Sequence, residues 1–126
     1  MLDLNNQGIT TNDGIIIGEL LKTNNTLTRL ALNDNNITDV QSIGEGLKTN
    51  NTLRVLNLGN NNITDDSGIQ SIIDVLKTNN TLKYLTLYNN QLSETMKSQL
   101  KAIQQYKRDG SNGYQRVKDT MRIYTY

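Results

Sequence analysis

The sequence predicts an α/β solenoid of about 3.5 repeats, with parallel strands on a concave face and helices on the convex face. One motif, Leu-x-x-Leu-x-Leu-x-x-Asn-x-Ile/Leu, occurs three times between residues 27 and 92. A shortened copy, Leu-x-Leu-x-x-Gln-x-Ile, begins at Leu2, and the same seven residues, LKTNNTL, lead into each full copy. Equivalent leucines are 28, 26 and 29 residues apart. Self-similarity at such a period is typical of a protein in which one supersecondary unit stacks on the next.

Each motif begins with a short strand. The two leucines of Leu-x-Leu point to one side of the strand and the residue between them points to the other. The Asn three residues later lies in the turn, where its amide can donate to and accept from backbone groups of neighbouring repeats. We therefore expect a structural ladder of four side chains along the solenoid: Gln7, Asn35, Asn61 and Asn90.

A helix is predicted in the second half of each repeat. Residues four and seven positions before the leucine of LKT form one apolar stripe at helical period: Ile17 and Gly14, Ile43 and Val40, Ile72 and Ile69. Acidic residues stand where a helix start favours them: Asp13, Asp39, and Asp65 or Asp66. Each helix is expected to end at an Asn in the left-handed conformation: Asn24, Asn50 or Asn79. The second repeat has the shortest helical half, so its helix should be the shortest.

The carboxyl end departs from the repeat. Ser93 can cap a helix from Glu94 to about Tyr106, with one apolar face and one outward polar face: Met96, Leu100 and Ile103, against Lys97, Lys101 and Gln104. We divide the chain into a solenoid with its terminal helix, residues 1–107, and a basic tail, residues 108–126. The tail has a helical spacing of Tyr114, Val117, Met121 and Tyr124. A short amphipathic helix, a flap over the last repeat and a frayed end remain open.

The repeat pattern resembles the leucine-rich repeat family, and specifically its ribonuclease-inhibitor-like branch of long repeats, also found in NOD-like receptors and bacterial effectors. The resemblance covers residues 1–92 well and residues 93–107 loosely. It implies a horseshoe segment whose concave strands recognise another protein. Because the amino terminus does not have the form of a signal peptide, we also expect a cytoplasmic protein, or one delivered into a host cell if the source is an intracellular bacterium.

Composition argues against an enzyme. The chain has no cysteine and no histidine, which removes thiolate ligands, the commonest metal ligand and the usual acid–base group near neutral pH. No motif supplies a base for a serine or threonine nucleophile, and Asp65-Asp66 is explained by a helix start. We therefore predict no catalytic residues, no metal and no cofactor. The amino terminus does not have the form of a signal peptide, and no apolar run is long enough to span a bilayer.

The remaining candidate is a surface on the strands. Side chains that alternate with the core leucines should face the concave side, and Arg54 lies beside them. The predicted partner-binding residues are Asp3, Asn5, Arg29, Asn33, Arg54, Val55, Asn57, Tyr84, Thr86 and Tyr88. Tyr84 and Tyr88 are the expected anchors, and Arg29 and Arg54 could pair with carboxylates of the partner.

Two alternatives come from the ends of the chain. Exposed repeat ends could drive self-association into a homodimer. Residues 94–126 carry seven Lys/Arg against three Asp/Glu, whereas residues 1–93 carry six against nine. The basic tail could therefore contact acidic lipid or nucleic acid, although four net charges make nucleic acid an unexpected partner.

Overall fold

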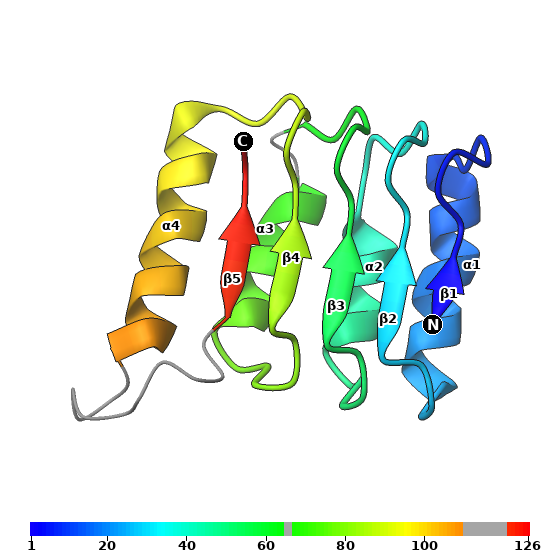
Figure 1. The fold of residues 1–126 in the computed structure, drawn as a ribbon, viewed down its shortest axis with the longest axis horizontal. Helices are drawn as coiled ribbons and strands as arrows, with labels where there is room; N and C mark the ends of the chain where they lie inside the picture. Colours follow the sequence, from blue (N-terminus) through cyan, green and yellow to red (C-terminus); the bar gives the residue numbers. More distant parts are fainter. Residues whose placement is uncertain (65–66, 110–120) are drawn as a thin grey trace.

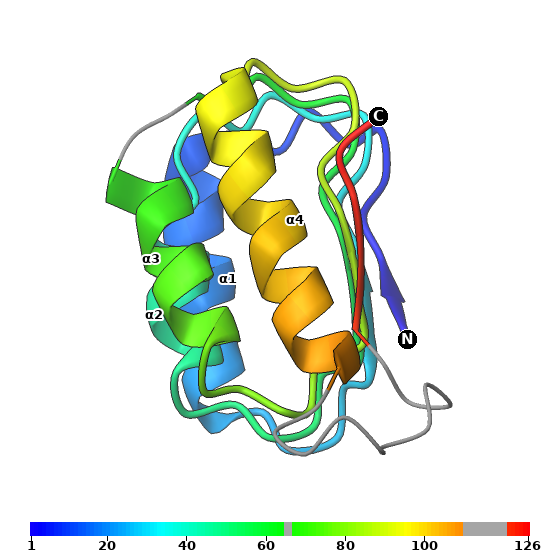
Figure 2. The ribbon, with the colours of Figure 1, turned by 90° about the vertical axis from the view of Figure 1, so that its left-hand side faces the viewer.

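The computed structural model describes residues 1–64, 67–109 and 121–126. Five parallel strands form one sheet in chain order (Figure 1). Four helices lie on one side of this sheet (Figures 1 and 2). The strands are β1 (Leu2–Asp3), β2 (Arg29–Ala31), β3 (Val55–Asn57), β4 (Tyr84–Thr86) and β5 (Arg122–Tyr124). The helices are α1 (Thr11–Thr23), α2 (Gln41–Leu47), α3 (Ser67–Leu76) and α4 (Glu94–Asp109).

The register of the sheet follows the repeat spacing. Leu2 pairs with Leu30, Leu30 with Leu56 and Leu56 with Leu85. Leu30, Leu56 and Leu85 are fully buried between the sheet and the helices, as are the second leucines of the motif, Leu32 and Leu58. The predicted solenoid is therefore confirmed. Among the described residues, no helix is both long and apolar enough to cross a membrane.

The predicted helical stripe is confirmed. Ile17, Ile43 and Ile72 are buried, and so are the other stripe residues, Gly14, Val40 and Ile69. The helix of the second repeat, α2, has seven residues and is the shortest of the four. Burial of one apolar stripe per helix, rather than helix propensity, accounts for so short a helix.

The helix starts differ in detail from the prediction. Thr10 is the residue that caps α1, and Asp13 completes a capping box by accepting the backbone N–H of Thr10 at 3.0 Å. Asp39 lies outside α2, where its carboxylate accepts the backbone N–H of Gln41 at 2.9 Å. Asp65 and Asp66 lie outside the described residues. In α1 the acidic residue thus stands in the first turn rather than at the cap itself.

The expected left-handed helix ends are wrong. Asn24 is extended, with φ −73° and ψ 126°, and neither Asn50 nor Asn79 has positive φ. The left-handed non-glycine residues of the described chain lie in the turns after the strands: Asn6, Asp34, Asn60 and Asn89. The physical reason is that the side chains of Asn24, Asn50 and Asn79 bond to the loop that follows. Each side-chain oxygen accepts the backbone N–H groups two and three residues ahead, which stabilises the exit without a left-handed residue.

The carboxyl end of the solenoid is only partly as predicted. The hydroxyl of Ser93 accepts the backbone N–H of Met96 at 3.1 Å, and α4 continues to Asp109. Lys97 and Gln104 do not simply face outward: the amide oxygen of Gln104 accepts the backbone N–H of Ile123, and the Lys97 ammonium lies 5.4 Å from the centroid of the Tyr126 ring. Both side chains contact the end of the tail because β5 lies beside α4 (Figure 2).

Of the three alternatives for the tail, the amphipathic helix is wrong for Met121 and Tyr124. Residues 122–124 form β5, which pairs with β4 with Ile123 in the place of the core leucine. Met121 is buried and Ile123 packs against the core. This segment therefore covers the last repeat, as in the flap alternative. Tyr114 and Val117 lie outside the described residues.

Candidate protein-binding face

The outer surface of the sheet, opposite the helices, is here named the strand face. Its residues follow the strand register in rows. The first row contains Arg29, Val55, Tyr84 and Arg122. The second contains Asp3, Ala31, Asn57, Thr86 and Tyr124. Asn5, Asn33, Gly59 and Tyr88 follow two residues further along the first four strands.

An open depression of about 310 Å³ lies at the centre of the strand face. Its lining residues come from β2 to β5: Arg29, Val55, Asn57, Tyr84, Thr86 and Tyr124. Asn57 is buried, whereas Tyr84 and Tyr124 remain 42% and 43% exposed. Two exposed tyrosines thus line a depression that is formed by strand residues. Such amphipathic rings supply a large contact area at little cost in conformational entropy.

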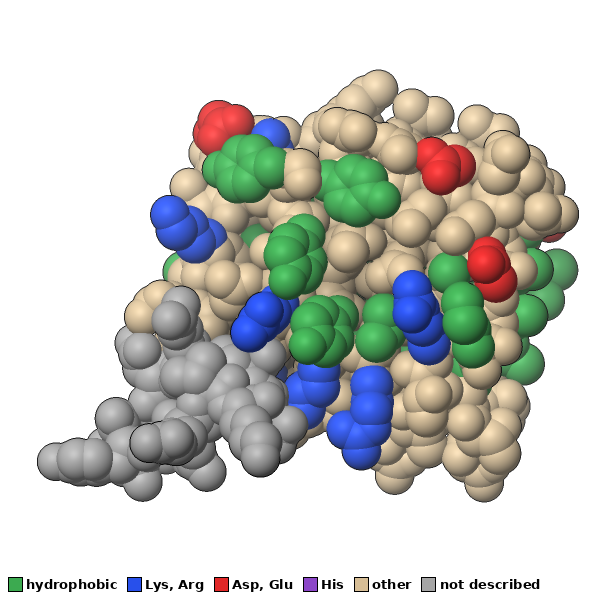
Figure 3. Space-filling model, in the orientation of Figure 1, with side chains coloured by type: hydrophobic (Ala, Val, Ile, Leu, Met, Phe, Trp, Pro, Cys, Tyr) green, Lys and Arg blue, Asp and Glu red, His purple; other side chains and the backbone are tan. Residues whose placement is uncertain are grey.

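Positively charged side chains lie at the starts of the strands that carry the tyrosines. Arg29, Arg54, Lys83 and Arg122 lie at the first residue of a strand or just before it. None of them forms an ion pair with another described residue. In Figure 3, Lys and Arg side chains lie among hydrophobic ones in the lower middle of this face, and the acidic side chains lie nearer its upper and right-hand parts. Burial, with a smaller contribution from the charge of Lys83, lowers the pKa of Lys107 at the end of α4.

The residues of the third row (Asn5, Asn33, Gly59 and Tyr88) contact one another. The side-chain oxygen of Asn5 accepts the backbone N–H of Asn33 at 2.7 Å, and that of Asn33 accepts the backbone N–H of Gly59 at 2.7 Å. Gly59 has no side chain to continue the series, and a methyl group there would lie 2.4 Å from the Tyr88 ring. Tyr88 therefore packs over Gly59 and is less available to a partner than Tyr84.

The structure brings together half of the predicted partner-binding residues. Arg29, Val55, Asn57, Tyr84 and Thr86 line one depression. Arg54 lies next to it, just before β3, while Asp3, Asn5 and Asn33 lie outside its lining. Sequence reasoning missed Tyr124 and Arg122. The signal was the alternation of Arg122, Ile123 and Tyr124, in which only Ile123 turns to the core.

The turn asparagines bind backbone groups across repeats. The amide nitrogen of Asn61 donates to the carbonyl groups of Leu32, Leu58 and Gly59, and its oxygen accepts the N–H of Ile37. Asn35 and Asn90 make the same kinds of bonds one repeat earlier and later. Gln7 differs, because its side chain is exposed and donates only to the Asn5 carbonyl. The three asparagines hold the strand ends in place, with both the nitrogen and the oxygen of each amide bonded to backbone groups.

A second set of amide bonds joins the helix exits. Asn50 donates to the carbonyl groups of Leu21 and Asn24, one repeat earlier. Asn79 donates to those of Leu47 and Asn50. At the last repeat the Lys107 ammonium donates to the Asn79 carbonyl, so α4 closes the series with a cation in place of an amide.

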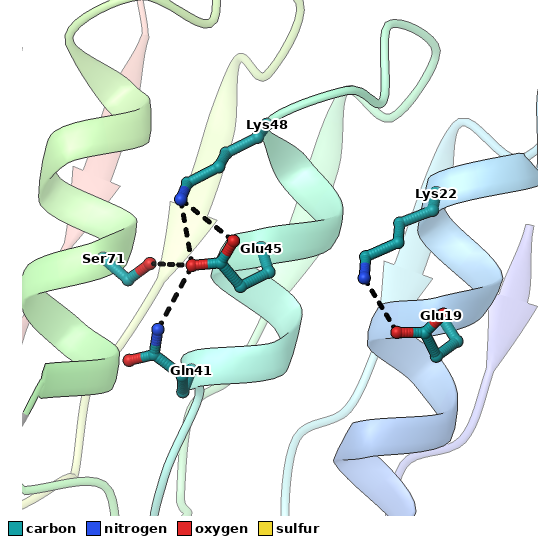
Figure 4. Close-up of polar contacts among 6 residues, drawn as sticks. All are labelled: Glu19, Lys22, Gln41, Glu45, Lys48 and Ser71. Atoms are coloured by element: carbon teal, nitrogen blue, oxygen red, sulfur yellow. Dashed lines mark hydrogen bonds and ion pairs between the residues drawn. The ribbon is translucent and has the colours of Figure 1, made fainter.

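A charged group with several hydrogen-bond partners lies on the helix side, away from the strand face. The Glu45 carboxylate accepts hydrogen bonds from Lys48 at 2.9 Å, Gln41 at 3.2 Å and Ser71 at 3.5 Å (Figure 4). The bond from Lys48 is the main cause of a lowered pKa of Glu45. Glu19 and Lys22 form a similar pair on α1. No three His, Cys, Asp or Glu residues of the described ranges are grouped closely enough to hold a metal ion.

Comparisons with known proteins agree with this architecture. Residues 23–40 and 49–70 match a family model described as Leucine Rich repeat. A solved structure of leiomodin-1 actin-binding site 2 has a similar fold, with a TM-score of 0.75 and 25% sequence identity over 99% of this chain and 68% of that chain. A comparison with curated proteins finds no match. Residues 23–40 and 49–70 thus resemble leucine-rich repeats in sequence, and the chain has the fold of a leucine-rich repeat solenoid.

Proposed function

We propose that the chain is a non-catalytic recognition module that binds a protein segment through its strand face. Tyr84 and Tyr124, on the adjacent strands β4 and β5, serve as anchors, and Arg29 and Arg122 pair with carboxylates of the partner. The observation that carries the proposal is the combination of two exposed tyrosines with cations that have no ion-pair partner among the described residues.

Three further features support this function. The anchors lie on hydrogen-bonded strands, so little backbone freedom is lost on binding. Exposed aromatic and arginine side chains are the residue types that dominate binding energies at protein interfaces. The solved structure with a similar fold, leiomodin-1 actin-binding site 2, is itself a site that binds another protein. We also propose that the repeats are of the ribonuclease-inhibitor-like type and that the protein is cytoplasmic.

The tail takes part in the proposed site. Arg122 and Tyr124 belong to residues 108–126, the segment that the sequence separates from the solenoid. Because β5 pairs with β4, these two side chains join the rows that begin on β2 and β3. The tail therefore serves recognition through the strand face, rather than as an independent contact for lipid or nucleic acid.

Actin is the first partner to test, because the similar solved structure is an actin-binding site. Co-sedimentation of the chain with actin filaments measures the affinity of the wild type and of the variant Tyr84→Ala/Tyr124→Ala. We expect the double variant to bind at least about tenfold more weakly, since anchor residues of this type contribute more than about 1 kcal/mol each. The matched control is Tyr106→Ala, which removes a tyrosine that is 68% exposed on α4.

Equal losses in Tyr106→Ala and in the double variant would place the binding site away from the strand face. Full actin binding by a folded double variant would show that Tyr84 and Tyr124 are not anchors. If the wild type does not bind actin, the affinities of the same three proteins are measured for a partner captured by cross-linking. The loss of affinity in the double variant is then again compared with the loss in Tyr106→Ala.

A further inference from the structure

The first row of the strand face crosses four adjacent strands and has a cation at each end. In the sheet register, Arg29 of β2 lies beside Val55 of β3, Val55 beside Tyr84 of β4, and Tyr84 beside Arg122 of β5. Arg29 and Arg122 are exposed, and neither forms an ion pair with another described residue. The row therefore consists of a cation, an aliphatic side chain, a tyrosine and a second cation.

The register also determines how far apart the two arginines lie. The strands β2 to β5 are consecutive in one sheet, and adjacent strands lie about 4.8 Å apart, so about 14 Å separates the backbone at Arg29 from that at Arg122. An extended peptide rises about 3.3 Å per residue and directs every second side chain to the same side. Side chains i, i+2 and i+4 of such a peptide therefore face one surface and span about 13 Å.

An extended segment that crosses the strands would thus place three side chains on the first row. Those at i and i+4 would reach Arg29 and Arg122, where carboxylates are favoured because arginine binds them with two charge-assisted hydrogen bonds. The side chain at i+2 would lie between Val55 and Tyr84, which line the depression. An apolar side chain is favoured there, because it can pack on the valine and on the tyrosine ring.

Further cations lie beside this row. Arg54 and Lys83 directly precede the first-row residues of β3 and β4, and Arg54 is exposed. Burial is the main cause of the lowered pKa of Lys107, and the charge of Lys83 adds to it, so positive groups lie close together at this border. Of the described residues in the three rows, only Asp3 is acidic, and it lies on β1, outside the depression. The part of the strand face that contains the depression is thus positively charged (Figure 3).

We infer that the strand face recognises an extended acidic segment with carboxylates at positions i and i+4 and an apolar side chain at i+2. This inference rests on the function proposed above and gives the chemistry of the partner. The segment crosses β2 to β5, its carboxylates bind Arg29 and Arg122, and its apolar side chain enters the depression. Single-stranded nucleic acid matches the row less well, because its backbone carries charge at every nucleotide whereas the middle of the row is uncharged.

Chemical-shift titration of the isotope-labelled full chain with short peptides tests this inference, since the method detects weak binding. The first peptide, blocked at both ends, is Ser-Ser-Glu-Ser-Leu-Ser-Glu-Ser-Ser. The second has Gln in place of both Glu, and the third has the same composition with the two Glu adjacent. We expect the Gln peptide to bind at least about fivefold more weakly than the first, because two ion pairs are lost. The third peptide should bind at least about twofold more weakly, because only one Glu can then reach an arginine.

Variants of the chain show whether the two arginines cause this preference. Arg29→Gln/Arg122→Gln should bind the Glu and Gln peptides alike. The matched control is Lys22→Gln/Lys77→Gln, which removes two cations from α1 and from the end of α3, on the helix side. It changes the net charge equally and should keep the preference. Raising the salt concentration from about 0.01 M to about 0.1 M should weaken binding of the Glu peptide more than that of the Gln peptide.

The inference is wrong if the first peptide binds no better than the Gln peptide, or if Arg29→Gln/Arg122→Gln keeps the preference. Tighter binding of a thymidine trinucleotide, whose two phosphate groups carry the same charge as the first peptide, would make nucleic acid the partner class instead.

The two proposals fail separately. If a partner protein binds the strand face while the peptides bind alike, recognition by this face stands and the acidic segment is wrong. If the Glu preference is present while Tyr84→Ala/Tyr124→Ala binds the partner fully, the acidic segment stands and the tyrosine anchors are wrong.

Discussion

At the residue scale, Asn61 shows how one side chain joins successive repeats. Its side chain is 5% exposed and makes four hydrogen bonds to backbone groups. Asn61→Ala would leave buried carbonyl groups unpaired, so we expect urea denaturation to show a loss of about 2–4 kcal/mol in the free energy of unfolding. Gln7→Ala, at the exposed equivalent position, should change it by less than about 0.5 kcal/mol. Similar losses in both variants would contradict this role for the turn amide.

The lowered pKa of Glu45 predicts in which direction the free energy of unfolding changes at acid pH. Its pKa lies below the ordinary value of 4.5, chiefly through the hydrogen bond from Lys48. The folded state therefore binds this proton less readily than the unfolded state. The resulting stabilisation is complete above pH 4.5 and is lost as the pH falls through the pKa of the folded state.

The variants Glu45→Gln and Lys48→Met should both lose part of this acid dependence. Chemical denaturation from about pH 6 to about pH 3 should show that each variant's deficit in stability, relative to the wild type, shrinks as the pH falls. A deficit that stays constant or grows toward low pH would show that the carboxylate is not coupled to folding in this way.

At the element scale, the helices approach one another through glycine. A methyl group on Gly18 would meet the Ser42 carbonyl, whereas one on Gly14, one turn earlier in α1, would meet nothing within 4 Å. We expect Gly18→Ala to lower the free energy of unfolding by about 1–3 kcal/mol, because α1 and α2 must separate. Gly14→Ala should raise it by about 0.5–1 kcal/mol through helix propensity. Thermal unfolding measures both, and a stabilising Gly18→Ala would show that the helices can shift at no cost.

The strands and helices of the four repeats could be predicted from the sequence, because leucine spacing reports directly on the buried side of each element. The strand β5 could not. Its segment keeps a single core residue, Ile123, in place of two leucines, and Tyr114, Val117, Met121 and Tyr124 also fit a helical period. Pairing with β4 decides between the two, and that contact is invisible in local spacing.

The same limit applies to the asparagines and to the site. Asparagine suits both a left-handed turn and an extended loop whose side chain bonds ahead, so residue type alone misassigned Asn24. The long-range bonds of Asn50 and Asn79 to the preceding repeat show which form applies to these exits. Tyr84 could be predicted as an exposed strand residue, whereas Tyr124 joins it only through β5.

At the scale of the whole molecule, the solenoid has two unlike ends and one continuous face. The last repeat is covered by α4 and β5 (Figure 2), whereas the first repeat exposes Ile15, Ile16 and Leu20. The strand face combines tyrosines with cations on a rigid sheet. We propose that this face recognises a partner protein.

The most direct test of the central claim is to map the bound surface by methyl NMR while actin is added to the isotope-labelled chain. Val55 and Thr86 lie on the strand face, Ile16 lies on α1, and Leu85 in the core serves as the internal reference. We expect the methyl signals of Val55 and Thr86 to change and those of Ile16 to stay unchanged. Changes at Ile16 with none at Val55 and Thr86 would contradict recognition through the strand face.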